Sequence, residues 1–177
     1  MLGYENTAPV TMDQMCMFTE AVSNGRQNAL IVADLPNKSY ENEIDAVSNS
    51  ERLINAGADA VKFQAWRAID LYDEKHPNWR EIKKSELTFE NIKLLKDFAD
   101  KNKIDFFCSS FYPEAVGFLS SLNVKMHKVA SRTCLFKDPY SYETLQKKAK
   151  TGKPIIISMG MGGNKNKIKK IFSKNEI

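Results

Sequence analysis

The sequence has little cysteine and no long apolar run, and both shortages narrow the classes of protein it can belong to. Cys16, Cys108 and Cys134 are its only cysteines, with neither paired spacing nor a CxxC motif. This argues against a disulfide framework or a zinc site and leaves the three as small buried apolar residues. No apolar stretch approaches the length of a membrane-spanning helix, and the first residues lack the pattern of a signal peptide. We therefore expect a cytoplasmic protein without a membrane partner.

The chain also lacks a strong excess of charge of one sign. Its formal net charge is +4, with 42% hydrophobic and 27% charged residues, which is typical of a soluble globular protein. Several lysines crowd together near the end, and such a cluster is typical of a solvated helix face. We expect no nucleic-acid partner.

Helical and strand patterns alternate along the chain. Thr11 and Gln14 form a capping-box pattern at the start of the first expected helix. A polar connection containing His76 separates the second strand from the next long helix and is expected to be a loop. Alternation of this kind predicts parallel strands joined by right-handed crossovers, hence an α/β fold. The expected helices are 11–25, 43–55, 88–102, a short one from Pro113, 142–150 and one in the tail; the expected strands are 28–34, 60–64, 104–109, 124–131 and 154–159.

The stretch AGADAVKFQ, residues 56–64, places a lysine inside an expected strand. Lys62 and Gln64 fall on one face of that strand, and Val61 and Phe63 fall on the other. Burying an unpaired ammonium group is costly, so Lys62 requires an anionic partner or water. Two interpretations follow: a structural salt bridge, or a lysine that binds an anionic ligand.

Polar residues also fall at the carboxyl ends of the expected strands, where parallel α/β folds bind ligands. Two amines, several hydroxyl groups and a carboxylate at such a rim suit a small phosphorylated or carboxylated metabolite. The carboxylate, Asp34, could hold a divalent metal or simply cap a loop. The set is Asp34, Lys62 with Gln64, Ser109 with Ser110, Lys128 with Ser131, and Ser158.

Other candidates have simpler interpretations. His76 is expected to be a solvated loop residue, and His127 a packed histidine rather than a base, because it faces away from the Lys128 side of its strand. Gly160, Gly162 and Gly163 could bring backbone amides close to a phosphate, or could form a flexible turn.

Between about residues 55 and 166 the chain resembles the N-acetylneuraminate (sialic acid) synthase family. The matching stretches are AGADAVKFQ, ELTFENIKLLKDFADKNKIDFF, CSSF, HKVAS and TGKPIIISMGM. The resemblance implies a (β/α)8 barrel that condenses phosphoenolpyruvate with an N-acetylated amino sugar such as N-acetylmannosamine, aided by Mg²⁺ or Mn²⁺. It implies that Lys62 and Lys128 are catalytic and hold phosphoenolpyruvate. Gln64, Ser109 and Ser131 would bind substrate beside them.

The chain departs from that family's pattern after the serine of HKVAS. Arg132 and Thr133 stand where the family has glycine and then an acidic residue tied to catalysis. The family's metal-binding histidines lie in later strands, which this chain lacks, so the resemblance implies an incomplete metal site. A non-catalytic fragment that binds anions therefore remains an alternative.

Residues 1–41 resemble a different family, ketopantoate hydroxymethyltransferase. Asp34 matches that family's magnesium-binding aspartate in its VADLP motif, and Lys62 matches a lysine of its next strand. Gln64 replaces an acidic residue. Both families are (β/α)8 barrels, so we interpret the chain as a hybrid or fragment with a junction near residues 56–61. Ketopantoate formation from 2-oxoisovalerate is the alternative activity.

Together these observations predict a partial (β/α)8 TIM barrel of about five parallel strands. Residues 1–177 would form a single incomplete domain, with a hydroxymethyltransferase-like segment over 1–55 and a synthase-like segment over 56–177. A full barrel needs roughly 200 residues or more. Two open parallel edges would then remain, and we expect self-association to cover them.

Overall fold

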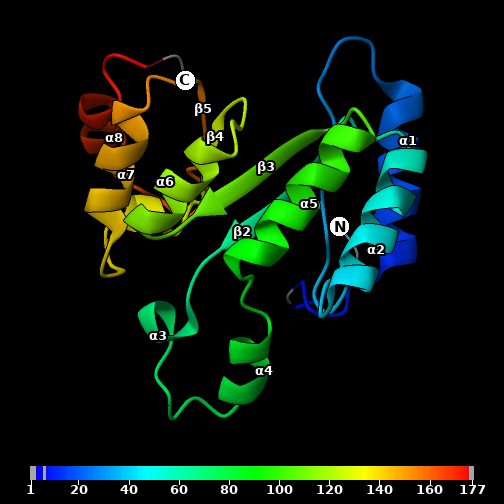
Figure 1. Ribbon diagram of the computed structural model, residues 1–177, viewed down its shortest axis with the longest axis horizontal. Helices are drawn as coiled ribbons and strands as arrows, with labels where there is room; N and C mark the ends of the chain where they lie inside the picture. Colours follow the sequence, from blue (N-terminus) through cyan, green and yellow to red (C-terminus); the bar gives the residue numbers. More distant parts are fainter. Residues whose placement is uncertain (1–2, 6, 176–177) are drawn as a thin grey trace. The chain divides into compact units, whose positions relative to one another are not determined.

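The computed structural model describes residues 3–5 and 7–175, in which helices and strands alternate (Figure 1). None of the helices in these ranges is long and apolar enough to cross a membrane. The elements are α1 (Met12–Gly25), β1 (Val32–Asp34), α2 (Glu43–Asn55), β2 (Ala60–Ala65), α3 (Ala68–Leu71), α4 (Trp79–Lys84), α5 (Phe89–Lys101), β3 (Asp105–Ser110), α6 (Pro113–Ser121), β4 (His127–Val129), the 3₁₀ turn η1 (Thr133–Leu135), α7 (Ser141–Lys150), β5 (Ile155–Ile157) and α8 (Lys165–Ile171).

The five strands form one parallel sheet in chain order, β1-β2-β3-β4-β5. Asp34 lies opposite Lys62 in the β1–β2 pair, and Ser109 lies opposite Lys128 in the β3–β4 pair. Helices connect the strands, as parallel pairing requires. The prediction of an α/β fold, a partial TIM barrel of five parallel strands, is confirmed.

The chain divides into two compact units, and β2 and β3 each contribute residues to both. The first unit comprises Met1–Phe63 and Lys93–Phe106. Its core includes Leu53, Val61, Phe63 and Phe106, all buried. The rings of Phe63 and Phe106 stack with their centroids 5.5 Å apart. In the same unit α1 and α2 lie side by side (Figure 1), joined by an ion pair between Asp13 and Arg52.

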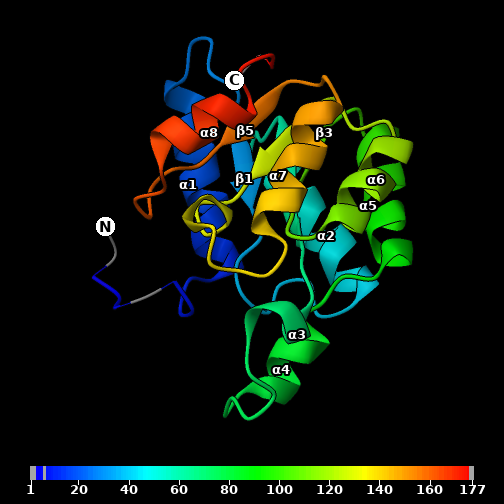
Figure 2. The ribbon, with the colours of Figure 1, turned by 90° about the vertical axis from the view of Figure 1, so that its left-hand side faces the viewer.

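The second unit comprises Gln64–Ile92 and Phe107–Ile177. Helices α7 and α8 pack against β4 and β5 in this unit (Figure 2). The core between them is apolar and almost completely buried, which is the main stabilising contribution expected from this part of the chain. Its residues are Val129, Cys134, Leu145, Ile155, Ile168 and Phe172.

Local sequence signals explain several element boundaries. Thr11 and Gln14 form the expected capping box at the start of α1. Helix α2 spans the predicted residues and begins after Asn42, whose side chain accepts a hydrogen bond from the Asp45 N–H. Pro113 occupies the first turn of α6, where its missing N–H is not needed.

Several boundaries differ from the prediction. Strand β1 begins at Val32 rather than at residue 28, and β5 spans Ile155–Ile157 rather than 154–159. The fourth strand is much shorter than 124–131, because the N–H of Val124 still bonds to Leu119 O at the end of α6. After the strand, Ala130 and Ser131 O accept hydrogen bonds from the backbone of η1. The connection after β2 was predicted to be a loop, but it contains the short helices α3 and α4, which lie against each other. They are too short to give a periodic apolar pattern.

The turn between α2 and β2 generates a prediction. Gly57 has φ +97°, and a Cβ added there would lie 2.2 Å from Ser23 Oγ of α1. We expect Gly57→Ala to lower the free energy of unfolding by about 1–3 kcal/mol, because an L side chain is strained at this φ. Gly25→Ala is the matched control, since a Cβ at Gly25 meets no atom within 4 Å. Urea denaturation measures both; equal effects at the two glycines would contradict this account.

Candidate functional site

Lys62 finds its anionic partner on the neighbouring strand of the first unit. Its Nζ lies 3.0 Å from Asp34 Oδ1, and the two residues are register partners in β1 and β2. The Lys62 side chain is only 14% exposed, whereas that of Asp34 is 57% exposed. The pair therefore places a largely buried ammonium group beneath a carboxylate that solvent can reach. Gln64 follows on the same face of β2 and is half-buried.

The Asp34 carboxylate also influences the pKa of a tyrosine in the first unit. Burial and the nearby Asp34 carboxylate raise the pKa of Tyr40, whose ring meets Phe63 edge-on with centroids 6.4 Å apart. Tyr40 therefore keeps its proton at neutral pH. A phenol in that state can donate a hydrogen bond.

In the second unit Lys128 lies among strand-end hydroxyl groups. Its Nζ donates to Ser158 Oγ at 2.6 Å and to Val129 O at 2.9 Å. Ser109 is its register partner on β3 and is buried. Ser131 follows β4, and its Oγ lies 3.8 Å from the position that a Cβ on Gly160 would take. The predicted residues Ser109, Lys128 and Ser131 thus belong to one set of strand ends.

A second lysine in this unit was not predicted from the sequence. Lys148 of α7 is 0% exposed and donates to Lys128 O at 2.7 Å and to Ser110 O at 2.9 Å. Burial lowers the pKa of Lys148 to about 7. The helical spacing of Ser141, Thr144 and Lys148 is the signal that could have found it, but a polar stripe on a helix ordinarily faces solvent.

Arg132 has a structural role in the second unit. Its guanidinium donates from Nε and Nη2 to the Asp138 carboxylate at 2.9–3.0 Å, and from Nη2 to Leu71 O at 3.0 Å. The hydrogen bond to Asp138 is the main cause of a raised Arg132 pKa. Arg132 therefore joins the end of α3 to the segment after β4 as a permanent cation.

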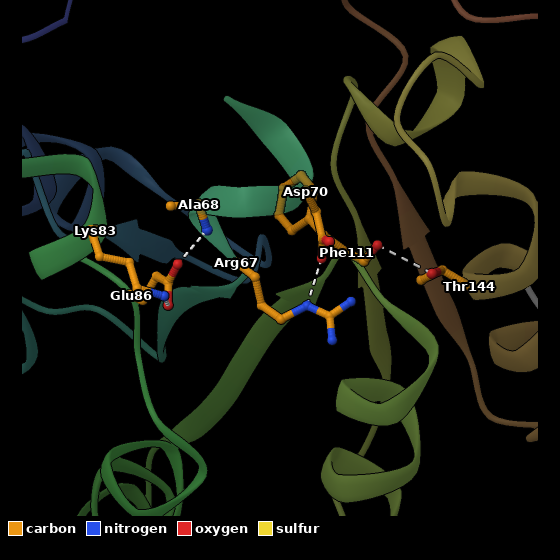
Figure 3. Close-up of polar contacts among 7 residues, drawn as sticks. All are labelled: Arg67, Ala68, Asp70, Lys83, Glu86, Phe111 and Thr144. Atoms are coloured by element: carbon orange, nitrogen blue, oxygen red, sulfur yellow. Dashed lines mark hydrogen bonds and ion pairs between the residues drawn. The ribbon is translucent and has the colours of Figure 1, made fainter. Parts of the chain in front are cut away.

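The segment that follows β2 is itself held by side-chain bonds, as Figure 3 shows. Arg67 Nε donates to Asp70 Oδ2 at 2.5 Å. The Ala68 N–H donates to the Glu86 carboxylate, which also pairs with Lys83 Nζ at 2.8 Å. These bonds tie the start of α3 to the end of the α4 segment and fix the chain beyond β2.

Packing requires glycine at position 163, after β5. A Cβ on Gly163 would lie 2.5 Å from Cys134 Cβ and 2.8 Å from Cys134 O, so only glycine fits there. Helix α8 follows with seven residues, and the Asn164 side chain accepts a hydrogen bond from the Lys167 N–H. A Cβ on Gly160 would meet only Ser131 Oγ, at 3.8 Å, and one on Gly162 would meet no atom within 4 Å, so close packing explains Gly163 alone.

The metal expected from the resemblance has one candidate ligand here, Asp34. Within residues 3–5 and 7–175, no group of three or more His, Cys, Asp or Glu could hold a metal ion. Asp34 is paired with an ammonium group rather than with other carboxylates. These residues therefore do not fit a resident divalent metal on their own.

Both histidines and two of the three cysteines lie as predicted from the sequence. His127 is buried, and its Nε2 lies 3.4 Å from Ser120 Oγ, whereas His76 is exposed. Cys108 and Cys134 are buried and form no disulfide among the described residues. Cys16 was also predicted to be buried, but it is only half-buried in α1.

Two segments of the chain match two different protein families. Residues 51–173 match the NeuB family, and residues 1–73 match ketopantoate hydroxymethyltransferase, so the two matches overlap in α2 and β2. A 3-methyl-2-oxobutanoate hydroxymethyltransferase of Nitrosopumilus maritimus is 72% identical over 65 residues, which is 36% of this chain and 23% of that protein. An uncharacterised protein of Methanocaldococcus jannaschii is 38% identical over 105 residues, 59% of this chain and 30% of that protein.

A solved structure resembles most of the chain. The N-acetylneuraminic acid (sialic acid) synthetase of Leptospira borgpetersenii, in complex with citrate, superposes with a TM-score of 0.71 at 24% identity. The match covers 84% of this chain and 51% of that structure. The chain thus spans about half of this structural relative and about a quarter to a third of the curated relatives above.

The buried histidine generates a prediction about pH. Burial, together with Lys148 and Lys153, lowers the pKa of His127 from 6.5 to about 4. Because the unfolded chain binds the proton more readily, stability present above about pH 6.5 is lost as the pH falls toward 4. We expect His127→Gln to remove up to about 2–3 kcal/mol of this loss. Denaturant titrations at pH 7, 5.5 and 4.5 measure it, with exposed His76→Gln as control; identical slopes for all three proteins would refute it.

Proposed function

The chain belongs to the NeuB family, and on that basis we propose that it binds phosphoenolpyruvate at its strand ends and condenses it with an N-acetylated amino sugar. The observation that carries the proposal is the set of lysine and serine side chains at the carboxyl ends of adjacent parallel strands. Both lysines lie inside the segment that matches the family, residues 51–173.

Charge is the first argument. Phosphoenolpyruvate carries a phosphate and a carboxylate, and two ammonium groups would offset them. Lys62 already pairs with the Asp34 carboxylate, which solvent can reach, so a ligand anion would bind this amine by displacing Asp34. Lys128 donates to a serine hydroxyl and a backbone carbonyl. We propose that each amine is an anion-binding group of its own unit.

Hydroxyl groups supply the second argument. Ser109, Ser131 and Ser158 accompany Lys128 at the strand ends, and hydroxyl groups can donate to phosphate oxygens. Gln64, on the same face of β2 as Lys62, could bind the sugar through its amide. In the condensation, carbon 3 of phosphoenolpyruvate would attack the aldehyde carbon of the open-chain sugar, and the aldehyde oxygen would take up a proton. Water would add to carbon 2, from which inorganic phosphate leaves to give the 2-oxo acid.

Two features predict slow turnover. By the resemblance, Arg132 and Thr133 stand where the family pattern has glycine and then the acidic residue, and Arg132 is committed to Asp138 and Leu71 O. The described residues do not make a metal site on their own. Binding without turnover, the behaviour of a non-catalytic anion-binding fragment, is therefore the nearest alternative.

Ketopantoate hydroxymethyltransferase activity is a second candidate, favoured by one observation. Both Asp34 and Lys62, the ion pair of the first unit, lie within the segment that matches that family, residues 1–73. In this alternative Asp34 would bind Mg²⁺, and the substrate would be 2-oxoisovalerate with a folate one-carbon donor. The matched segment is only part of those relatives, 23% in the Nitrosopumilus protein.

A ligand-dependent melting experiment tests the proposal. Millimolar phosphoenolpyruvate should raise the melting temperature, because a ligand at about 100 times its Kd stabilises a protein by about 2.7 kcal/mol. Lys62→Ala and Lys128→Ala should each reduce the shift, whereas Lys101→Ala, which removes an exposed amine at the end of α5, should preserve it.

Three results would redirect the proposal. No shift with the wild-type protein at millimolar phosphoenolpyruvate would exclude a working site. A shift that survives both site substitutions would place the ligand elsewhere. Ketopantoate formation that requires Mg²⁺ and is lost in Asp34→Asn would establish the second candidate.

We also propose that the chain associates with itself through its sheet edges. Strand β1 has one neighbour in the sheet, β2, and strand β5 has one neighbour, β4. Val32 on β1 and Ile156 on β5 are exposed apolar residues, and unpaired strands of this kind favour association. Light scattering after size exclusion should give a mass at least twice 20.1 kDa. A monomer at every concentration tested would contradict it.

A further inference from the structure

Helix α7 presents a buried polar face to the ends of two strands in the second unit. Ser141, Thr144 and Lys148 lie on this face, and each is at most 2% exposed. Thr144 Oγ1 donates to Phe111 O at 3.2 Å, a bond that Figure 3 shows. Lys148 Nζ donates to Ser110 O at 2.9 Å. Two successive carbonyls at the end of β3 are thus held by one helix.

The same amine also holds the neighbouring strand. Lys148 Nζ donates to Lys128 O at 2.7 Å, so one side chain binds the carbonyl of the lysine that we assign to the ligand. An uncharged lysine amine has two N–H bonds, and the two carbonyl acceptors match them in number. Protonation adds a third N–H, which is costly to bury without an acceptor.

We propose that Lys148 is a positioning residue for the anion site: it fastens the ends of β3 and β4 from beneath and takes up a proton when an anion binds to Lys128. The first part rests on the hydrogen bonds alone. The second part rests on the proposed function, because it requires an anion at Lys128.

The groups around the amine set its protonation. Burial is the main cause of the lowered pKa of Lys148, and the positive charge of Lys128 lowers it further. Cys108 and Cys134 act in the opposite direction. His127 also faces the amine, but its own pKa of about 4 keeps it neutral near pH 7. Lys148 is therefore poised to change protonation close to neutral pH.

Anion binding alters this balance in a defined direction. An anion at Lys128 offsets the charge that disfavours protonation of Lys148, so the pKa of Lys148 rises in the complex. By linkage, binding takes up protons near pH 7 and the anion binds more weakly as the pH rises. A rise of one pH unit in the pKa corresponds to about a tenfold loss of affinity between acidic and alkaline solution.

Calorimetry with sulfate tests the inference, since sulfate does not titrate between pH 6 and 9, unlike phosphate or phosphoenolpyruvate. The full chain is titrated with sulfate at several pH values, in two buffers of different ionisation enthalpy. We expect uptake of a fraction of one proton near pH 7, and an affinity about tenfold higher at pH 6 than at pH 9.

Variants assign the proton to its residue. Lys148→Met should still bind sulfate but without proton uptake, and Lys148→Gln, which retains an N–H donor on a shorter stem, should do the same if the first variant does not fold. Lys150→Met, an exposed lysine of the same helix, should behave as the wild type. Lys128→Met should lose sulfate binding.

The outcomes separate the inference from the function on which it rests. Sulfate binding without proton uptake in the wild-type protein overturns the role of Lys148 and leaves the anion site intact. Equal uptake in the wild type and in either Lys148 variant assigns the proton to another group and also overturns it. No sulfate binding by the wild-type protein overturns the anion site and this inference together.

Discussion

The cost of placing amines inside a protein governs this structure more than any other constraint. An ammonium group removed from water must be paired, hydrogen-bonded or neutralised. Lys62 is paired with Asp34, Lys128 bonds to the Ser158 hydroxyl, and the buried Lys148 bonds to two strand carbonyls with its pKa lowered to about 7. The contacts of all three amines lie at or near strand ends, the region where parallel α/β folds bind their ligands.

The lysine amines have different surroundings in the two units. In the first unit the amine faces an exposed carboxylate, an arrangement that an incoming anion or cation can alter. In the second unit the amine lies among hydroxyl groups and carbonyls that keep their form over the physiological pH range. Arg132, paired with Asp138, is a structural cation of the second unit.

Much of the fold could be predicted because local signals agree with the tertiary packing. The capping residues of α1 and the apolar spacing of α2 gave their boundaries, and strand–helix alternation indicated the parallel sheet. The boundaries of β4 could not be predicted, because Val124 has a strand-like side chain but its N–H serves the end of α6. Lys148 was missed since a lysine on a polar helix face ordinarily meets water, and only the packing of α7 on the strand ends reveals the buried amine.

The central claim is that Lys128 of the second unit binds an anionic ligand group together with the Ser158 hydroxyl. A crystal structure of the protein grown with phosphoenolpyruvate tests it most directly, because it locates the amine and the ligand at once. We predict that Lys128 Nζ lies within hydrogen-bond distance of a phosphate or carboxylate oxygen of the ligand, with Ser158 beside that group. Well-ordered ligand bound away from Lys128 would contradict the account.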